Sequence, residues 1–251
     1  MANNLLKAND NIQIDYTIHF PNKRKVKIDH KYGNIYTTDH YGELDITLSN
    51  GDLMAGKLFN DSKIDLSFGK AIIKELYNSR IVSNYGEINA EKAKDLNIQS
   101  KSSTIDLDEV SKVNINSRRD EIYISKVQRL SGEFSFSKIH TENLIYEAII
   151  NAYYGNVNLE NHNDNLQLIS LTGSYTDIKI VLPEQNTCSL EIIHTEKTSL
   201  DISKDLGELK QELIDKDEEK YRSVITSKDN KSSDSRVYIE TKGGYINIKN
   251  D

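Results

Sequence analysis

The sequence is short of residues that several kinds of structure and chemistry require. Among its 251 residues it has no Trp, two Pro and a single Cys, Cys188. One cysteine excludes an internal disulfide framework and a multi-cysteine zinc site. No run of 18 apolar residues occurs, so we expect no membrane span. The first ten residues, MANNLLKAND, lack the charged and then apolar layout of a signal peptide.

Basic charge is also in deficit, because 39 acidic residues outnumber 32 basic ones and the formal net charge is −7. We therefore expect no nucleic-acid partner. Hydrophobic residues make up 37% of the chain and charged residues 28%, which is enough for a lean core. Scarce proline, 14 Tyr and frequent Ile and Asn favour repeated strands and turns over a helical bundle.

What the sequence does contain is an internal repeat of 17 or 18 residues. Phrases such as KYGNI at 31–35 recur, and we take their glycine as position zero. The residues at this position are Gly33, Gly51, Gly69, Gly86, Ser103, Asp120, Ser137 and Gly155, and at longer gaps Thr176, Thr198 and Gly244. We expect glycine here to allow a positive φ at a corner, with Ser, Asp and Thr as weaker substitutes.

Aliphatic residues occupy fixed positions relative to this zero. Two residues after it stand Ile35, Leu53, Ala71, Ile88, Ile105, Ile122, Ile139, Val157, Ile178, Leu200 and Ile246. Five residues before it stand Ile28, Ile46, Ile64, Ile81, Ile98, Ile115, Gly132, Ile150, Leu171, Ile193 and Ile239. Seven residues after it, the middle repeats have Leu58, Leu76, Ala93, Val110, Val127 and Leu144.

Within each strand the inward residues alternate with polar ones, which is the period of a strand with one buried face. The sequence therefore predicts an all-β fold, a single-stranded β-helix (solenoid) of about ten coils of 17–18 residues in which like residues stack. A polar insertion is expected before the last coil.

Just before position zero the residue is often aromatic, as in Tyr32, Phe68, Tyr85, Phe136, Tyr154 and Tyr175. A sugar-binding stripe is one interpretation of this column. We expect packing inside the corner instead, because the position shares the parity of the inward positions.

The chain is expected to form one solenoid domain over 1–251. An N-terminal strand and lead-in occupy 12–24, where apolar and polar residues alternate through Ile12, Ile14, Tyr16, Ile18 and Phe20. Regular coils follow over 25–203. Near 183–198 the register loosens, and Leu190 and Ile192 compete with Ile193 for the inward position.

The charged stretch 204–236 is the expected polar insertion, placed to cover the end of the rod. It offers a strand fragment at 206–209, a short helix over 208–222 and a loop over 227–235. Residues 237–251 restore the repeat and are expected to form the terminal coil.

Apolar-x-apolar followed by Tyr-Gly-x-Ile is the recurring phrase of this chain. In IDYTIHFPNKRKVKIDHKYGNIYTTDHYGELDI at 14–46 and RVYIETKGGYINIKND at 236–251 it resembles a bacterial family of proposed adhesins whose function is unknown. The resemblance covers most of the chain. It implies a single-chain β-helix in the cell envelope, in the periplasm or on the outer surface, without catalytic residues.

Candidate chemical groups are dispersed along the repeat. His40 and His162 share a column but lie seven coils apart, so we expect no metal site. Glu91 and Asp108 share a column on adjacent coils, a spacing that suits Ca²⁺ or acid–base chemistry. Nearby lysines favour a solvated face of mixed charge instead. Nucleotide-binding glycine motifs are absent, and we predict no cofactor and no enzymatic activity.

One outward column is apolar at its start. Tyr36, Met54 and Ile72 lie three residues after position zero on successive coils, so they are expected to stack as an exposed strip. Exposed contiguous apolar area marks a binding site. The alternative is that residues 38–43 or 56–62 fold over the strip.

Three functions are compatible with this fold. The first is a binding or structural protein of the cell envelope, monomeric or weakly dimeric, with a protein or glycan partner. The second is a β-helix that assembles end to end into filaments, for which both terminal coils must be bare. The third is a carbohydrate-active enzyme, which needs acids and bases that converge in a groove. The insertion at 204–236 favours the first.

Overall fold

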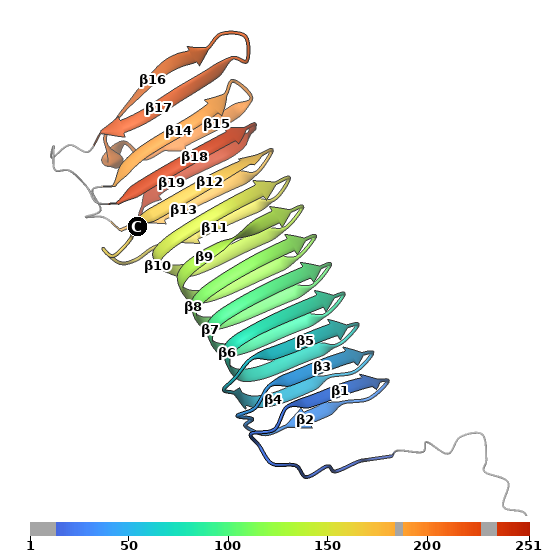
Figure 1. The fold of residues 1–251 in the computed structure, drawn as a ribbon. Coiled ribbons are helices and arrows are strands. Elements are labelled where there is room, and N and C mark those ends of the chain that lie inside the picture. Colours follow the sequence, from blue (N-terminus) through green and yellow to red (C-terminus); the bar gives the residue numbers. More distant parts are fainter. Residues whose placement is uncertain (1–13, 184–187, 227–234) are drawn as a thin grey trace, which may run out of the picture.

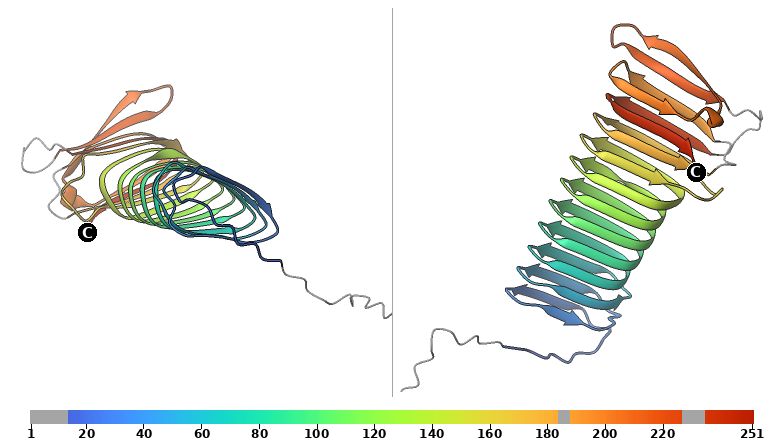
Figure 2. Two further views of the ribbon diagram at one scale, coloured as in Figure 1. Left: turned by 60° about the horizontal axis from the view of Figure 1, so that its bottom comes forward. Right: turned by 180° about the vertical axis from the view of Figure 1, so that it is seen from behind.

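The alternating aliphatic residues bury one face of the strands that form the coils, and the turns of the chain bring these faces together. The computed structural model describes residues 14–183, 188–226 and 235–251, and it is an all-β solenoid of about nine turns. Its coils stack into a long rod (Figure 1), and each coil is a flattened loop when the rod is viewed nearly end-on (Figure 2). The predicted fold class is confirmed.

The strands differ in length along the rod. The N-terminal coils are built from β1 (Val26–Lys31), β2 (Ile35–Thr37), β3 (Leu44–Ser49), β4 (Leu53–Leu58) and β5 (Ser62–Ser67). Middle coils run as long bent strands, namely β6 (Lys70–Asn84), β7 (Glu87–Lys101), β8 (Thr104–Arg118), β9 (Glu121–Ser135) and β10 (Lys138–Tyr153). Later coils contain β11 (Asn156–Glu160), β12 (Leu168–Ser174), β13 (Asp177–Leu182), β14 (Ser189–Thr195) and β15 (Thr198–Ile202). The chain ends with η1 (Lys204–Leu206), β16 (Glu208–Asp215), β17 (Lys220–Thr226), β18 (Arg236–Lys242) and β19 (Gly244–Asn250).

The predicted inward columns form the core. Ile28, Ile46, Ile64, Ile81, Ile98 and Ile115 are paired in register on successive parallel strands. All but Ile28, in the first coil, are fully buried. The column seven residues after zero is buried as well. Near the loosened register Leu190 and Ile192 point inward, and Ile192 rather than Ile193 pairs with Ile239. The assignment of Ile193 to the inward column was therefore wrong.

The corner at position zero is built differently from the expectation. The positive φ belongs to the residue before zero, as in Tyr85 with φ 55°. Glycine at zero is required for another reason, because a Cβ on Gly51 would collide with the carbonyl oxygen of Gly33 in the coil below. Where the column changes to Ser103, Asp120 and Ser137, these side chains are buried and hydrogen-bonded.

The C-terminal coil is not the terminal coil of the rod. On one face β18 pairs with β12 on one side and with β14 on the other, and on the second face β19 lies between β13 and β15. The last residues of the chain are therefore inserted between two coils that precede them in sequence (Figure 1). Sequence periodicity specifies that 237–251 forms a coil, but it does not specify its neighbours, because every coil offers the same inward columns.

The polar insertion forms the end of the rod. β16 and β17 make an antiparallel hairpin, and β17 extends the sheet antiparallel to β14. The predicted strand fragment at 206–209 overlaps β16, whereas the alternative helix over 208–222 is wrong. Residues 227–234 of the expected loop lie outside the described residues. Leu206 of the short η1 packs against the core and is partly buried, as are Leu200 and Ile202 of β15.

The N-terminal segment departs from its sequence pattern. Residues 14–20 form no strand, and Ile14, Tyr16 and Ile18 are exposed, so the predicted strand is wrong there, while 12–13 lie outside the described residues. Residues 22–24 instead pack beneath the first loop, where Tyr41 N–H donates to the Asn22 carbonyl at 2.8 Å. Alternation alone does not make a strand when no neighbouring edge pairs with it.

Candidate binding surfaces

The Tyr36–Met54–Ile72 strip lies open on the surface. The three residues are in register on β2, β4 and β6. Their exposed fractions are 71%, 46% and 37%, so neither 38–43 nor 56–62 covers them. Parity and spacing placed them correctly, and their role in binding remains a prediction.

The aromatic column before position zero faces solvent. Tyr32, Phe68, Tyr85, Phe136, Tyr154 and Tyr175 have exposed fractions between 50% and 82%. The expected inward packing is therefore wrong. Parity fails because the positive φ at this position breaks the alternation of the strand, so the side chain turns outward at the corner.

The exposed rings stack on one another along the rod axis. Phe68 and Tyr85 form one parallel pair with their ring centroids 5.1 Å apart. Phe136, Tyr154 and Tyr175 form a stack of three in which neighbouring ring centroids are 5.2 and 5.3 Å apart. Bulky residues at positive φ are disfavoured, and Asn50 shows that a smaller residue occupies the same position with φ 55°. The corner geometry therefore does not require aromatic side chains.

Two coils without an aromatic residue separate the two stacks. Ser102 and Arg119 occupy the column there, and at about 4.8 Å per coil Tyr85 and Phe136 are roughly 14 Å apart along the axis. Lys101 and Arg118 precede them, and Lys101 Nζ lies 6.0 Å from the Tyr85 ring centroid. We call this segment, bounded by Tyr85 and Phe136, the corner gap.

The corner gap carries positive charge on an acidic protein. Lys101, Arg118 and Arg119 are exposed, and none of them has an ion pair with another described residue. Most other cations along the coils do, for example Lys138 with Glu121 at 3.0 Å. Unpaired cations on three positions of adjacent coils are therefore available to an anionic ligand.

A buried carboxylate fixes the backbone under the corner gap. Asp120 is 2% exposed and accepts hydrogen bonds from Ser103 N–H at 2.7 Å and Arg118 N–H at 2.9 Å. Its second oxygen also accepts from the hydroxyls of Ser100 and Ser117, both at 2.7 Å. Four donors on one carboxylate hold the two coils of the gap in one arrangement.

The paired carboxylates considered from the sequence lie on an open face. Glu91 and Asp108 are both exposed. Beside them Glu109 accepts a hydrogen bond from Lys126 at 3.0 Å, which lowers the pKa of this carboxyl, and Lys92 lies 3.9 Å away. This is the mixed-charge face that the nearby lysines indicated.

A shallow hollow of about 470 Å³ lies over β3, β5, β6 and β7 and is bordered by Lys25, which precedes β1. Its walls carry both signs of charge, including Lys25, Glu43, Asp61 and Arg80. Lys25 and Glu43 pair with each other at 2.7 Å. The part of the chain that the structure describes holds no cluster of three or more His, Cys, Asp or Glu side chains able to bind a metal.

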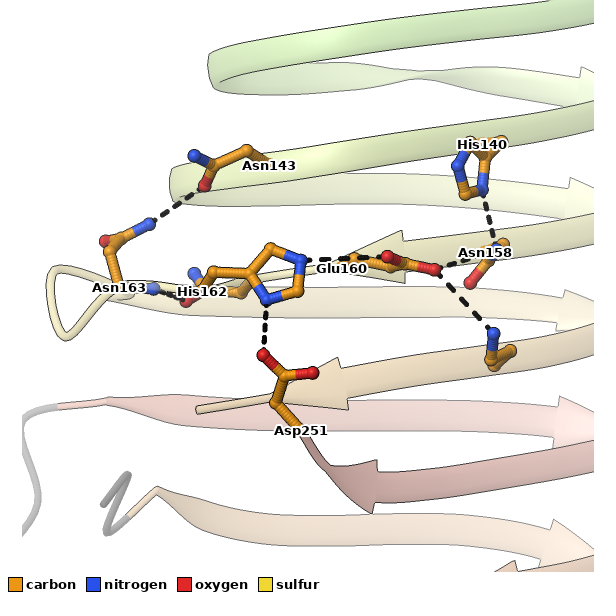
Figure 3. Close-up of polar contacts among 9 residues, drawn as sticks. His140, Asn143, Asn158, Glu160, His162, Asn163 and Asp251 are labelled. Atoms are coloured by element: carbon orange, nitrogen blue, oxygen red, sulfur yellow. Dashed lines mark hydrogen bonds and ion pairs between the residues drawn. The ribbon is translucent and has the colours of Figure 1, made fainter. Parts of the chain in front are cut away.

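Two histidines bridge segments near the C-terminal end of the rod. His162 contacts Asp251 at 2.8 Å through Nδ1 and Glu160 at 3.7 Å through Nε2, which ties the C-terminal residue to the loop after β11 (Figure 3). His194 on β14 is buried and its Nε2 lies 3.0 Å from Ser223 Oγ on β17. These contacts secure the inserted coil and the terminal hairpin.

Comparison of the chain with protein-family models, with curated proteins and with solved structures gave no match. The resemblance to bacterial adhesins therefore remains a prediction. The described residues also include no helix with the length and apolarity that a membrane crossing requires.

Proposed function

We propose that this protein is a non-catalytic binding rod that recognises an acidic polysaccharide along its aromatic corner. The observation that carries the proposal is the exposure of stacked aromatic rings at positions where the backbone disfavours them. Aromatic faces pack against the apolar C–H faces of sugar rings, and the rigid rings lose little entropy on binding.

The corner gap defines the class of sugar. Within each stack the inner ring faces cover one another, and the faces of Tyr85 and Phe136 that border the gap have no further ring stacked on them among the described residues. Lys101, Arg118 and Arg119 lie between them. A uronic-acid or otherwise anionic saccharide meets both requirements, since its ring packs on the aromatic face and its carboxylate pairs with guanidinium or ammonium.

A rod of this kind suits an adhesin-like protein of the cell envelope, the location that the family resemblance implies. Three unpaired cations on a chain of net charge −7 favour a short acidic saccharide over a nucleic acid, which needs a long positive track. The Tyr36–Met54–Ile72 strip is a separate apolar surface on another part of the coil.

Calorimetric titration of the full chain with oligogalacturonate, and with a neutral glucan of equal length, tests the proposal. We expect binding of the acidic oligosaccharide only. Tyr85→Asn and Arg119→Ser should each weaken it about tenfold or more, because they remove one ring face or one cation. Both substitutions use residues that already occupy this column, at Asn50 and Ser102.

Matched controls are Tyr123→Asn and Lys112→Ser, which remove an exposed ring and an exposed cation elsewhere. They should leave the affinity unchanged. Equal loss in Lys112→Ser would show non-specific ion exchange, and binding of oligo-dT with the same dependence on Tyr85 would assign the gap to nucleic acid. Either result, or no binding of the acidic oligosaccharide, overturns the proposal.

A further inference from the structure

The two ends of the rod are built from different strands. In the first coil Val26 and Ile28 are only partly buried, whereas their neighbours Leu44 and Ile46 in the next coil are 2% and 0% exposed. Among the described residues β1 pairs only with β3, and β2 only with β4. At the other end, the hairpin of β16 and β17 extends the face of β14, whereas β15, with Leu200 and Ile202 partly buried, pairs only with β19 among the described residues.

The two ends present different strands on the first face, because β1 ends this face at one end and the antiparallel hairpin ends it at the other. An end that meets its own copy through a two-fold axis gives a closed pair. An unpaired edge strand beside a partly exposed core is the usual template for such pairing.

The backbone of β1 shows which residues are free to pair. Val26 N–H donates to the Glu43 carbonyl at 2.9 Å and Tyr32 N–H to the Ser49 carbonyl at 3.0 Å, so the even-numbered residues face β3. Lys27 and Asp29 therefore direct their N–H and C=O groups to the open edge. Their side chains lie on the outer face of the coil, since both are exposed.

We propose that two copies of this chain join at their N-terminal ends through an antiparallel β1–β1 pair centred on Ile28. In this register Lys27 of each copy lies directly opposite Asp29 of the second copy, and both residues use their free backbone groups. The partly exposed Val26 and Ile28 of both copies then cover one another.

Several registers of the β1–β1 pair keep the core-facing side chains of both strands on the core side, and charge favours this one among them. A shift by one residue would reverse the faces of one strand. Moving the two-fold centre by one residue either way places Lys27 opposite Lys27, or Asp29 opposite Asp29, which is repulsive. Lys25, which lies opposite Lys31 in the favoured register, already pairs with Glu43.

This inference is independent of the proposed saccharide site, because β1 and the corner gap lie several coils apart. The test is the mass of the full chain measured by sedimentation equilibrium over a range of concentrations. We expect a monomer–dimer equilibrium for the wild type. Lys27→Asp and Asp29→Lys should each raise the dimer dissociation constant about tenfold or more, because two attractive pairs become repulsive.

Variants that exchange the charges at positions 27 and 29 test the proposed pairing directly. An equimolar mixture of Lys27→Asp and Asp29→Lys chains should form a heterodimer, since every opposed pair is again attractive, and the double variant should dimerise by itself. Lys63→Asp, on the same face two strands along, is the control and should behave as the wild type. Circular dichroism checks that each variant is folded.

Three outcomes would overturn the inference. One is a wild-type chain that stays monomeric at high concentration. A second is association that the two charge variants leave unchanged, which would assign it to the exposed apolar residues of 14–20. The third is growth into species larger than a dimer, which a closed two-fold pair does not allow.

Discussion

Asp120 accepts a hydrogen bond of 2.7 Å from the backbone N–H of Ser103, which occupies the same repeat position one coil earlier. At Gly51, Gly69 and Gly86 in this column, a glycine makes room for the carbonyl oxygen of the preceding coil. Here a carboxylate enters the corner and bonds to backbone and hydroxyl donors of two coils. At the corner gap a buried polar cluster therefore takes the place of the close backbone packing that the glycines allow.

Asp120→Ala should destabilise the protein by about 3 kcal/mol, because two backbone N–H groups and two hydroxyls lose a charged acceptor in a buried place. Urea unfolding followed by circular dichroism measures the change. Asp106→Ala, an exposed aspartate on β8, is the matched control and should shift stability by less than about 0.5 kcal/mol. Equal effects in the two variants would contradict the structural role assigned to Asp120.

Ile98→Asp should cost several kcal/mol, because the new carboxylate would be buried between Ile81 and Ile115 with no partner. Asn97→Asp adds the same carboxyl group one residue away on the exposed face of β7. Thermal melting of the two variants separates burial from charge. A mild effect in Ile98→Asp would mean that this column does not form the core.

The inward columns could be predicted because they depend only on strand period and on the stacking of equal coils. Ile46 and Ile64 meet for that reason alone. The outward aromatic corner could not be found this way, because the positive φ at Tyr85 and its equivalents interrupts the alternation. The sequence did contain a sign that this column is exposed. Asn, Ser and Arg replace the aromatic residues at some of its positions, and these residue types suit an exposed position better than a buried one.

The position of the C-terminal coil could not be predicted either. Ile239 fits next to Leu171 and next to Ile192 equally well by pattern, and in the structure it lies between them. The antiparallel hairpin before it reverses the direction of travel along the rod, and no repeat signal encodes that reversal. The corner gap similarly depends on which cations lack partners, which only the three-dimensional arrangement of charges reveals.

Ile239→Asp should loosen the inserted coil and expose β14, and the single cysteine reports this. Cys188 is buried directly before β14, and burial raises the pKa of its thiol to about 11, so reaction with a maleimide should be slow in the wild type. We expect labelling at least tenfold faster in Ile239→Asp. Lys249→Asn, an exposed change on β19, should label as slowly as the wild type. Unchanged labelling in Ile239→Asp would show that β14 does not depend on the insertion.

Glu191 on β14 holds both of its neighbouring strands, since it accepts hydrogen bonds of 2.8 Å from Arg222 on β17 and from Arg236 on β18. The hydrogen bond from Arg222, with that from Arg236, lowers the pKa of the Glu191 carboxyl below its ordinary value.

A lowered pKa in the folded state means that the contribution of Glu191 to the free energy of unfolding is complete above the unfolded value of about 4.3 and is lost as pH falls through the folded value. Glu191→Gln should therefore lower stability by about 1–2 kcal/mol at neutral pH and by progressively less below pH of about 4. Thermal melting of both proteins from neutral to acid pH measures the difference, and Glu133→Gln, an exposed glutamate on β9, should show none. A difference that stays constant down to acid pH would mean that the Glu191 ion pairs do not stabilise the end of the rod.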